Sequence, residues 1–414
     1  MRMVIVGAGA AGVSVAETIC KYSTVSEITV ISKESSLPYS PVALPEYIEG
    51  KIPKEQLFLW DDKFIKKKSI NLVLGKSVVS IQPRAKKIVM DDSSVLSYDK
   101  LLIASGASPI LPEDLINRKG VFTLRTLEDA EAIGHHMKER VIIYGAGAVA
   151  TKIAIALHKI GIDVIVLCRS RVLRRLFDED ICQIIHDILT INGVKIIGLH
   201  THVHLSGDPV DRLRIGTQEL SCDGVVVALG VSPNTSFVDS QHIRLGASGG
   251  VIVNGRMESS ASHVYASGDC IETNDITTGR SQVVALWPLA VEQGRTAALN
   301  MLGRETHYEG TLAQNVVDVF GTSFASIGSL DGEKIDKTTG GPISRFTIQK
   351  DKIVGCQLVG DINSAGLLSA GIKRGMTVKD LELLSSFGRL LPGHRAQIKV
   401  AGNSVSLGLL PFAA

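Results

Sequence analysis

Two segments of this chain share one pattern, in which a short apolar run leads into closely spaced glycines and then into helical periodicity. They extend from Val4 to Gly12 and from Val141 to Ala150. Each pattern predicts a strand, a tight turn and a helix, and each is followed by a further strand, at Glu27–Ser32 and at Asp163–Leu167. Two strand–helix–strand units of this kind predict an α/β protein with parallel sheets.

The rest of the chain predicts additional strands and a change of character near its end. Strands are expected at Val73–Leu74, Val78–Ile81, Lys87–Met90 and Tyr98–Ser105, with the second and third forming a small antiparallel addition. Residues Gly250–Asp269 predict strands followed by a Gly-Asp turn. A third unit after about Arg304 is predicted to contain strands Asn315–Phe320, Ile343–Gln349 and Ile353–Val359 and helices Ser364–Arg374 and Val378–Ser385.

The spacing of the glycines has a chemical meaning. In the first glycine loop, Gly7 makes the turn, Gly9 lets the backbone approach a pyrophosphate, and Gly12 packs the helix on the strand. The equivalent positions of the second glycine loop are Gly145, Gly147 and Ala150. One such motif is weak support, but two in the same context predict a chain that holds two dinucleotides and passes electrons between them.

Composition and charge agree with a multidomain enzyme that binds neither nucleic acid nor a membrane. The chain has 414 residues, of which 45% are hydrophobic and 21% charged, enough for two or three cores. Its formal net charge of +2 predicts neither nucleic acid nor a membrane as a partner. The N-terminus enters the first strand directly and no apolar run approaches about 18 residues, so we expect a cytoplasmic protein.

The cysteines predict no metal site. None of the six is spaced as CxxC or in a recognisable ligand pattern, so neither a structural disulfide nor an iron–sulfur cluster is expected. They are Cys20, Cys168, Cys182, Cys222, Cys270 and Cys356.

Five stretches together resemble the FAD-dependent pyridine nucleotide-disulfide oxidoreductases, a family that includes ferredoxin and rubredoxin reductases, the flavin part of nitrite reductase, NADH oxidases and coenzyme A disulfide reductases. They are the two glycine loops, Tyr98–Pro109, Asp223–Asn234 and Val264–Cys270, with secondary matches at Arg125–Ala130, Leu286–Trp287 and Gln293–Arg295. The resemblance implies two Rossmann-like domains and a C-terminal α+β interface domain. The FAD domain would be 1–112 and 245–308, the NAD(P) domain 113–244, and the interface domain 309–414.

The resemblance also implies cofactor-binding positions. By order along the chain, the first glycine loop binds FAD and the second binds NAD(P)H. The positions carried over are Gly7, Gly9, Ala10, Ala11, Gly12, Glu34, Pro41, Val79, Ala104, Ser105, Gly106, Arg125, Gly145, Gly147, Ala148, Val149, Arg169, Arg174, Gly230, Gly268, Asp269 and Trp287. Asp269 would accept a hydrogen bond from the flavin ribityl chain, although a plain helix N-cap is the alternative. Glu34 would bind a ribose from two positions beyond the usual acid.

The second unit lacks an acid at the end of its second strand and carries arginines there instead. Cys168 is followed by Arg169, Ser170 and Arg171. Guanidinium groups pair with phosphate oxygens, which favours the 2′-phosphate of NADPH, with Arg169 and one further arginine as the clamp. The candidates for the second arginine are Arg171, Arg174 and Arg175. A solvated basic loop is the alternative.

Two departures from the family concern the chemistry itself. Disulfide-reducing relatives have a cysteine where this chain has Val42, so disulfide reduction is disfavoured unless Cys270 reaches the flavin. Electron-transfer relatives often pair a lysine with a glutamate near the flavin, whereas this chain has Glu46 and Lys152 in the exchanged places. We expect these two to form the same pair reversed and to act in catalysis. Two unrelated solvated charges are the alternative.

These features predict electron transfer between NAD(P)H and an iron–sulfur carrier of the ferredoxin or rubredoxin type. The run Leu37–Lys51 resembles flavoprotein subunits such as that of phenylglyoxylate dehydrogenase, so the chain is expected to be a homodimer or a subunit of a hetero-oligomer. An NADH oxidase, a coenzyme A disulfide reductase and an assembly protein that FAD merely stabilises remain as alternatives.

Overall fold

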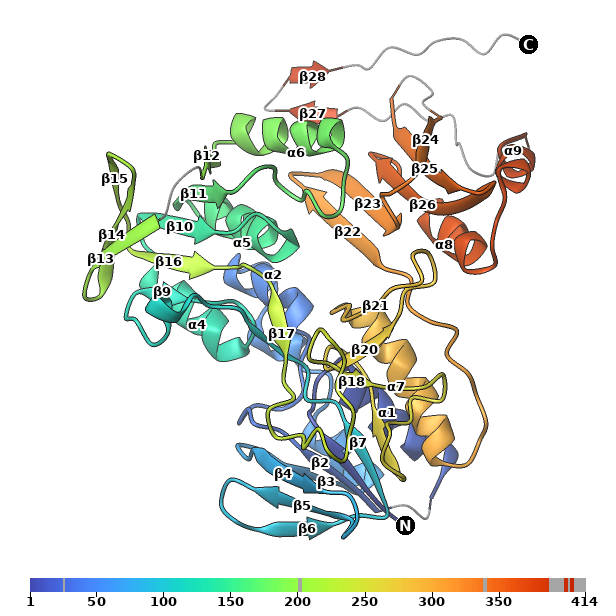
Figure 1. The fold of residues 1–414 in the computed structure, drawn as a ribbon. Coiled ribbons are helices and arrows are strands. Elements are labelled where there is room, and N and C mark those ends of the chain that lie inside the picture. The colour runs from blue at the N-terminus through green and yellow to red at the C-terminus, as the bar shows by residue number, and fades with distance from the viewer. Residues whose placement is uncertain (25–26, 200–202, 338–340, 387–397, 401–402, 406–414) are drawn as a thin grey trace. The chain divides into compact units, whose positions relative to one another are not determined.

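The computed structural model shows an α/β protein, as predicted (Figure 1). It describes residues 1–24, 27–199, 203–337, 341–386, 398–400 and 403–405. The chain forms two compact units: unit 1 is Met1–Pro109 with Val231–Thr311, and unit 2 is Ile110–Gly230 with Leu312–Ala414.

Unit 1 is built on a five-stranded parallel sheet in the order β19-β7-β1-β2-β3. The strands are β1 (Arg2–Val6), β2 (Glu27–Ile31), β3 (Ile70–Val73), β7 (Lys100–Ile103) and β19 (Val264–Ala266). β1 is central, and its residues Met3 and Ile5 are fully buried because both faces of the sheet are covered. Helix α1 (Ala10–Tyr22) connects β1 to β2, which confirms the first predicted strand–helix–strand unit.

Two helices of unit 1 pack closely against each other because small residues line their contact. α1 lies against α7 (Trp287–Met301), where a Cβ on Gly294 would stand 2.7 Å from the carbonyl oxygen of Ala11. A larger residue at position 294 would therefore push the helices apart. The contact fixes α7 beside the start of α1 (Figure 1).

The predicted antiparallel addition is present in unit 1, with one strand more than expected. It contains β4 (Val78–Gln82), β5 (Lys87–Met90) and β6 (Val95–Ser97). The other elements of unit 1 are η1 (Pro41–Ala43), α2 (Leu44–Ile48), η2 (Lys54–Leu57), α3 (Asp62–Lys68), β8 (Ala107–Pro109), β17 (Val231–Pro233), β18 (Val251–Ile252), β20 (Ile271–Asn274) and β21 (Ser281–Gln282).

Unit 2 contains a second parallel sheet, in the order β12-β11-β10-β16-β9. Its strands are β9 (Val121–Phe122), β10 (Arg140–Tyr144), β11 (Asp163–Cys168), β12 (Lys195–Gly198) and β16 (Gly224–Val227), and its helices are α4 (Leu127–His136), α5 (Ala148–Lys159) and α6 (Glu179–Ile191). β10, α5 and β11 confirm the second predicted strand–helix–strand unit. Between β12 and β16 the chain adds an antiparallel meander of β13 (Val203–Gly207), β14 (Val210–Ile215) and β15 (Gln218–Ser221).

The end of the chain adds an antiparallel sheet to unit 2, which we call the C-terminal sheet. Its order is β22-β23-β26-β25-β24, and its strands are β22 (Gln314–Val319), β23 (Thr322–Gly328), β24 (Glu333–Asp336), β25 (Ile343–Gln349) and β26 (Lys352–Val359). Helices α8 (Ala365–Lys373) and α9 (Val378–Ser386) follow as predicted. The remaining short elements of unit 2 are η3 (Glu113–Leu115), β27 (Ile398–Val400) and β28 (Asn403–Val405).

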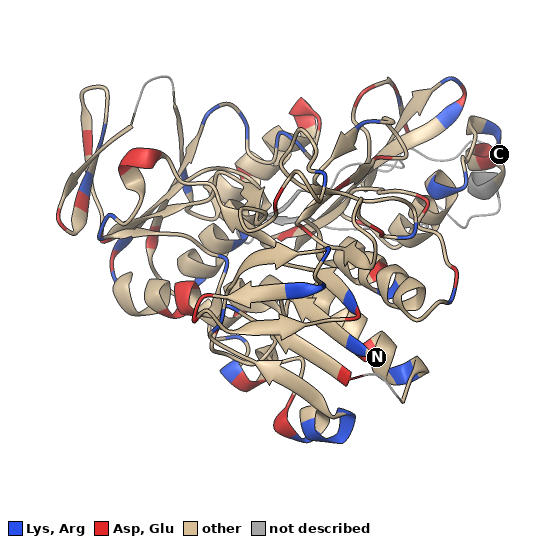
Figure 2. Ribbon diagram, turned by 60° about the horizontal axis from the view of Figure 1, so that its bottom comes forward, with Lys and Arg blue, Asp and Glu red and all other residues tan. Residues whose placement is uncertain are grey.

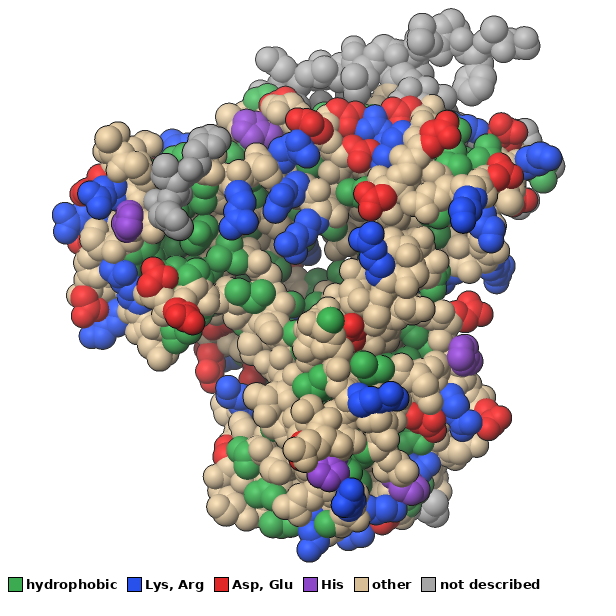
Figure 3. All heavy atoms as spheres, in the orientation of Figure 1, with side chains coloured by type: hydrophobic (Ala, Val, Ile, Leu, Met, Phe, Trp, Pro, Cys, Tyr) green, Lys and Arg blue, Asp and Glu red, His purple; other side chains and the backbone are tan. Residues whose placement is uncertain are grey.

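Charges of both signs are distributed over the described surface. Lys and Arg are interspersed with Asp and Glu along the ribbon (Figure 2). The face drawn in Figure 3 likewise mixes basic, acidic and hydrophobic side chains. This mixture agrees with the small net charge of +2.

Candidate functional site

The first glycine loop forms a cradle at the start of α1. Gly7 has φ +111, and a Cβ on it would lie 2.0 Å from the carbonyl oxygen of Ala104, so no other residue fits without displacing the neighbouring strand. A Cβ on Gly12 would lie 1.9 Å from the carbonyl oxygen of Gly7. Gly9, the N-cap of α1, has nothing within 4 Å of its Cβ direction and no side-chain cap. The loop is thus tight on the protein side and open above Gly9.

This open side has the properties of an anion site. The first turn of α1 contains no acidic residue, and it begins with Ala10 and Ala11, whose small side chains leave the helix N-terminus accessible. The N–H groups and the dipole of a helix N-terminus favour phosphate. The loop also lies at the end of β1, where strand order reverses in the sheet, the usual ligand position in such folds.

A crossing segment closes the cradle from the neighbouring strand. Ala104 follows β7 and packs on Gly7, and Ser105 and Gly106 continue from it. The hydroxyl of Ser105 donates to the carbonyl oxygen of Asn234 at 2.6 Å, and the amide of Asn234 donates back to the carbonyl oxygen of Ser105 at 3.0 Å. Asn234 is a residue that sequence reasoning did not assign. Its hydrogen bonds join the segment just before the chain leaves unit 1 at Pro109 to the segment just after it returns at Val231.

Asp269 reaches the same place from the end of β19. Gly268 precedes it with φ +84, and a Cβ on Gly268 would lie 3.0 Å from the Cβ of Ala11, so the turn touches the first turn of α1. The N–H of Gly268 donates to Oε1 of buried Gln293 at 2.9 Å. The structure therefore brings Asp269 to the first glycine loop, and Gln293 of α7 holds its turn. Trp287 is the first residue of the same helix.

The other expected FAD positions of unit 1 lie in segments that follow β2 along the chain. Glu34 lies just beyond β2, and its Oε2 accepts the hydroxyl of Tyr39 at 2.5 Å. Tyr39 was not predicted and orients the acid. Pro41 begins η1. Val79 is half exposed at an irregularity of β4, where the register passes from Val78 to Ser80 and leaves Val79 without a cross-strand partner. Such a bulge offers backbone groups to a ligand.

The second glycine loop repeats the geometry of the first in unit 2. Gly145 has φ +131, and a Cβ on it would lie 2.2 Å from the carbonyl oxygen of Ala228. Gly147 is open, as Gly9 is, and Ala150 is fully buried at the helix–strand contact. Ala148 and Val149 form the first turn of α5, which carries no acidic residue. Gly230, with φ +119, begins the connection after β16.

The segment 169–178, which we call the nucleotide loop, runs back to the second glycine loop. The N–H of Leu173 donates to the carbonyl oxygen of Ala146 at 2.8 Å. Arg169 and Arg174 are exposed, and within the described residues neither has an ion-pair partner. Arg171 instead pairs with Glu179 at 3.0 Å. Two guanidinium groups thus remain available beside a phosphate cradle. Arg125 lies before α4, where its N–H donates to Oδ2 of Asp129 at 2.8 Å.

Both cradles fit the groups that the sequence implied. Unit 1 brings a phosphate cradle and a carboxylate, Asp269, to one helix N-terminus, as a flavin nucleotide with its ribityl hydroxyls requires. Unit 2 brings a second cradle together with basic side chains and no acid of its own at the strand end, as a phosphorylated ribose requires. FAD, when bound, would supply the capacity to accept a hydride and to release single electrons.

The cysteines do not form a redox site. All six are free thiols, five of them buried, and burial raises the pKa of each. Cys270, the one expected nearest the flavin, is fully buried, donates weakly to the carbonyl oxygen of Ile103 at 3.4 Å, and has its pKa raised to about 11. Val42 is 48% exposed at the position of the missing thiol. A neutral thiol is a poor nucleophile, so this arrangement does not support disulfide exchange.

Glu46 and Lys152 belong to different units. Glu46 lies in the first turn of α2, and its Oε2 is buried without a hydrogen-bond partner among the described residues. Lys152 lies on α5, two residues after the helix contact at Ala150. A buried carboxylate oxygen without a partner is costly, which makes Glu46 a candidate for a cationic partner. Their pairing remains a prediction.

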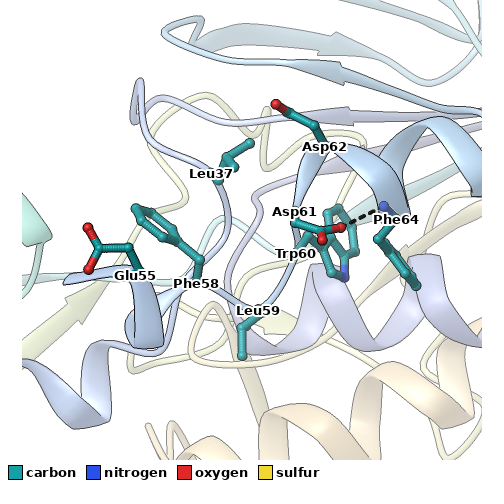
Figure 4. Close-up of a pocket in the computed structure, with 8 residues that line it drawn as sticks. All are labelled: Leu37, Glu55, Phe58, Leu59, Trp60, Asp61, Asp62 and Phe64. Atoms are coloured by element: carbon teal, nitrogen blue, oxygen red, sulfur yellow. Dashed lines mark hydrogen bonds between the residues drawn. The ribbon is translucent and has the colours of Figure 1, made fainter. Parts of the chain in front are cut away.

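A pocket of about 580 Å³ lies elsewhere in unit 1 (Figure 4). Aromatic side chains line it, and all its charged lining residues are acids, so it does not suit a phosphate. Its lining residues are Leu37, Glu55, Phe58, Leu59, Trp60, Asp61, Asp62 and Phe64. Neither glycine loop contributes to it.

Two further features are absent from the described part of the chain. No group of His, Cys, Asp and Glu side chains there could hold a metal ion. None of the helices described is both long and apolar enough to cross a membrane.

Comparison with known proteins gives the family. The pyridine nucleotide-disulphide oxidoreductase family matches residues 1–294. An NADH oxidase of Methanocaldococcus jannaschii is 30% identical over 397 residues, covering 87% of this chain and 88% of the relative. The epsilon subunit of NADH-dependent phenylglyoxylate dehydrogenase from Aromatoleum evansii is 29% identical over 337 residues, with 79% of each chain covered.

Among solved structures, the NAD-dependent persulfide reductase of A. fulgidus has a TM-score of 0.87 and 27% identity, covering 93% of this chain and 78% of that one. Members of this family bind FAD and NAD(P)H, in agreement with the two cradles. The chain belongs to the pyridine nucleotide-disulphide oxidoreductases and is an FAD-dependent NAD(P)H oxidoreductase.

Proposed function

We propose that this protein transfers electrons between NAD(P)H and an iron–sulfur carrier of the ferredoxin or rubredoxin type, through FAD and without a thiol. The observation that carries the proposal is the replacement of the redox cysteine by exposed Val42, together with six cysteines whose pKa values are all raised by burial. Without a thiolate, electrons that enter the flavin must leave to an external acceptor.

The proposal extends to assembly and domain roles. Residues 1–112 and 245–308 would bind FAD, 113–244 would bind NAD(P)H, and 309–414 would form an interface. The likeness to the phenylglyoxylate dehydrogenase epsilon subunit supports a flavoprotein subunit that exchanges electrons with iron–sulfur subunits, and a homodimer is the other arrangement. We place the protein in the cytoplasm.

An anaerobic reduction experiment tests this function. The FAD-loaded protein is mixed with NADH or NADPH, and flavin absorbance is followed before ferredoxin, rubredoxin or coenzyme A disulfide is added. We expect rapid bleaching and reoxidation by an iron–sulfur carrier. Absence of bleaching would favour an assembly protein that FAD stabilises, and turnover with coenzyme A disulfide alone would overturn the proposal.

An oxidase is the second candidate because the Methanocaldococcus relative is an NADH oxidase. Oxygen consumption with NAD(P)H and no protein carrier measures this activity. Oxygen turnover faster than carrier reduction would favour the oxidase.

We further propose that Glu46 and Lys152 form the reversed charge pair beside the flavin. The buried, unpartnered Oε2 of Glu46 supports this pairing. The exchange Glu46→Lys with Lys152→Glu should restore the hydride-transfer rate and flavin potential that each single variant loses. Failure of the double exchange to restore either quantity would remove the pair.

A further inference from the structure

The end of the nucleotide loop is bonded to the C-terminal sheet by a reciprocal pair of hydrogen bonds. The N–H of Asp178 donates to Oε1 of Gln357 at 2.7 Å, and the amide Nε2 of Gln357 donates to Oδ2 of Asp178 at 2.7 Å. Gln357 lies within β26 and is fully buried. One side chain thus satisfies both the backbone and the side chain of Asp178, which fixes its position and orientation.

Arg345 of β25 adds a charged connection at the same place. Its guanidinium binds both oxygens of Asp180, at 2.6 and 2.8 Å, and both oxygens of Asp336, each at 2.7 Å. The Arg345 side chain is only 13% exposed, so these bidentate contacts are partly shielded from water. Lys334 of β24 reaches Oδ2 of Asp178 at 3.2 Å. Asp180 lies in the first turn of α6, directly beyond the loop.

An aromatic contact holds the loop from its interior. Phe177 is 1% exposed, and its ring meets that of Phe324 of β23 edge-on, with centroids 5.9 Å apart. Four strands of the C-terminal sheet, β23 to β26, therefore contact the segment from Phe177 to Asp180. At its middle, the loop is bonded through Leu173 to the second glycine loop.

We propose that the C-terminal sheet positions the nucleotide loop for binding the nicotinamide nucleotide, with Arg345 and Gln357 as positioning residues. The inference rests on the proposed role of Arg169 and Arg174 at the 2′-phosphate. A loop that is already ordered pays less conformational entropy when its arginines close on a phosphate, so anchoring it raises affinity. Arg345 and Gln357 would act only through the loop and would not contact the nucleotide themselves.

The test compares nucleotide affinity with the other properties of the FAD-loaded protein. In Arg345→Gln and Gln357→Leu, the dissociation constant of NADP⁺, measured by calorimetry, should rise about tenfold. FAD content and kcat at saturating NADPH should stay at the wild-type value, because only the loop is released. Arg212→Gln is the matched control, since Arg212 is an exposed, ion-paired arginine of β14 in the same unit.

Trypsin cleavage supplies a second readout. The nucleotide loop contains Arg169, Arg171, Arg174 and Arg175, so release from the sheet should speed cleavage there, and NADP⁺ should slow it again. If Arg345→Gln does not fold, Arg345→Lys can be tested instead. Lysine keeps the positive charge but cannot make the bidentate contacts of the guanidinium group, so we expect a smaller rise in the dissociation constant of NADP⁺.

The outcomes separate this inference from the proposed function. Folded, FAD-loaded variants that bind NADP⁺ as tightly as the wild type, with unchanged cleavage, would overturn the positioning role. A wild type that does not bind NADP⁺ would instead contradict the 2′-phosphate clamp. The binding measurement involves no electron carrier. Its result therefore stays valid even if the protein does not use the proposed iron–sulfur carrier.

Discussion

At the scale of single residues, two glycines of the first glycine loop that are separated by one residue have different tasks. Gly7 has φ +111 and no room for a Cβ, whereas Gly9 has φ −79 and open space. Gly7→Ala should destabilise the apoprotein by about 3 kcal/mol, because the Cβ meets the Ala104 carbonyl. Gly9→Ala should leave apoprotein stability unchanged but weaken FAD binding about tenfold, since its methyl group would occupy the pyrophosphate side. Urea unfolding and FAD titration measure the two effects.

The pair of variants is its own control. If Gly9→Ala binds FAD normally, the pyrophosphate does not lie over the start of α1. Equal apoprotein stability in the two variants would contradict the crossing contact between Gly7 and Ala104.

Cys270 gives a prediction for alkaline pH. Burial raises the pKa of its thiol to about 11, whereas an unfolded cysteine ionises near about 8.5. Below about pH 8.5 the thiol is neutral in both the folded and the unfolded protein, so its ionisation does not lower the free energy of unfolding. As the pH rises toward 11, only the unfolded chain loses the proton, so the free energy of unfolding falls by about 1.4 kcal/mol per pH unit.

Cys270→Ala tests this contribution because it removes the ionisable group. Under reducing conditions, the variant's free energy of unfolding should fall less steeply between about pH 9 and pH 11 than that of the wild type. Identical slopes would show that the thiol ionises in the native protein.

Residue roles that depend on sequence-local geometry could be predicted, and those that depend on distant partners could not. The strained glycines follow from the strand–turn–helix pattern alone. Gln293 accepts a hydrogen bond from Gly268, 25 residues earlier in the chain, and Asn234 bonds to Ser105, 129 residues earlier. Only the fold brings such pairs together, and a lone Gln or Asn in a sequence does not indicate its partner.

At the scale of elements, the proposed role of the nucleotide loop at the 2′-phosphate predicts how the protein distinguishes NADPH from NADH. Arg169→Ala and Arg174→Ala should each raise the KM for NADPH about tenfold or more, because a charged hydrogen bond to the 2′-phosphate is lost, while the KM for NADH should change little. Arg171→Ala is the control, since Arg171 is paired with Glu179. Steady-state kinetics with both cofactors measures the difference. Equal effects on NADH and NADPH would mean that the arginines do not read the phosphate.

Elements with a buried, regular pattern were predictable, whereas half-exposed ones were not. The strands of both parallel sheets next to the glycine loops are continuous apolar runs, as expected where both faces are covered. The meander β13–β15 was not predicted as a unit, because its strands are short and mostly exposed. The alternation of a few apolar residues, such as Val203 with Leu205 and Leu213 with Ile215, is a weak signal. The sequence separated the end of the chain as a third unit. It did not indicate that β23 to β26 would support the nucleotide loop.

At the scale of the whole molecule, the number of electrons that the protein can hold distinguishes the proposed function from disulfide reduction. FAD takes up two electrons, and a redox-active cysteine with a mixed disulfide adds capacity beyond the flavin. Because every cysteine here is a free thiol of raised pKa, dithionite should reduce the protein with about two electrons per FAD and give no long-wavelength thiolate–flavin band. Anaerobic titration followed by absorbance measures both.

Val42→Cys provides the comparison for this titration. The exposed position should accept the smaller side chain without loss of stability, and a thiol there should restore the long-wavelength band on reduction if this segment faces the flavin as in disulfide-reducing relatives. A band in the wild type would show that one of its own thiols reaches the flavin. A variant without any band would mean that the segment around Val42 does not face the flavin, and the absence of a thiol at Val42 would no longer decide between electron transfer and disulfide reduction.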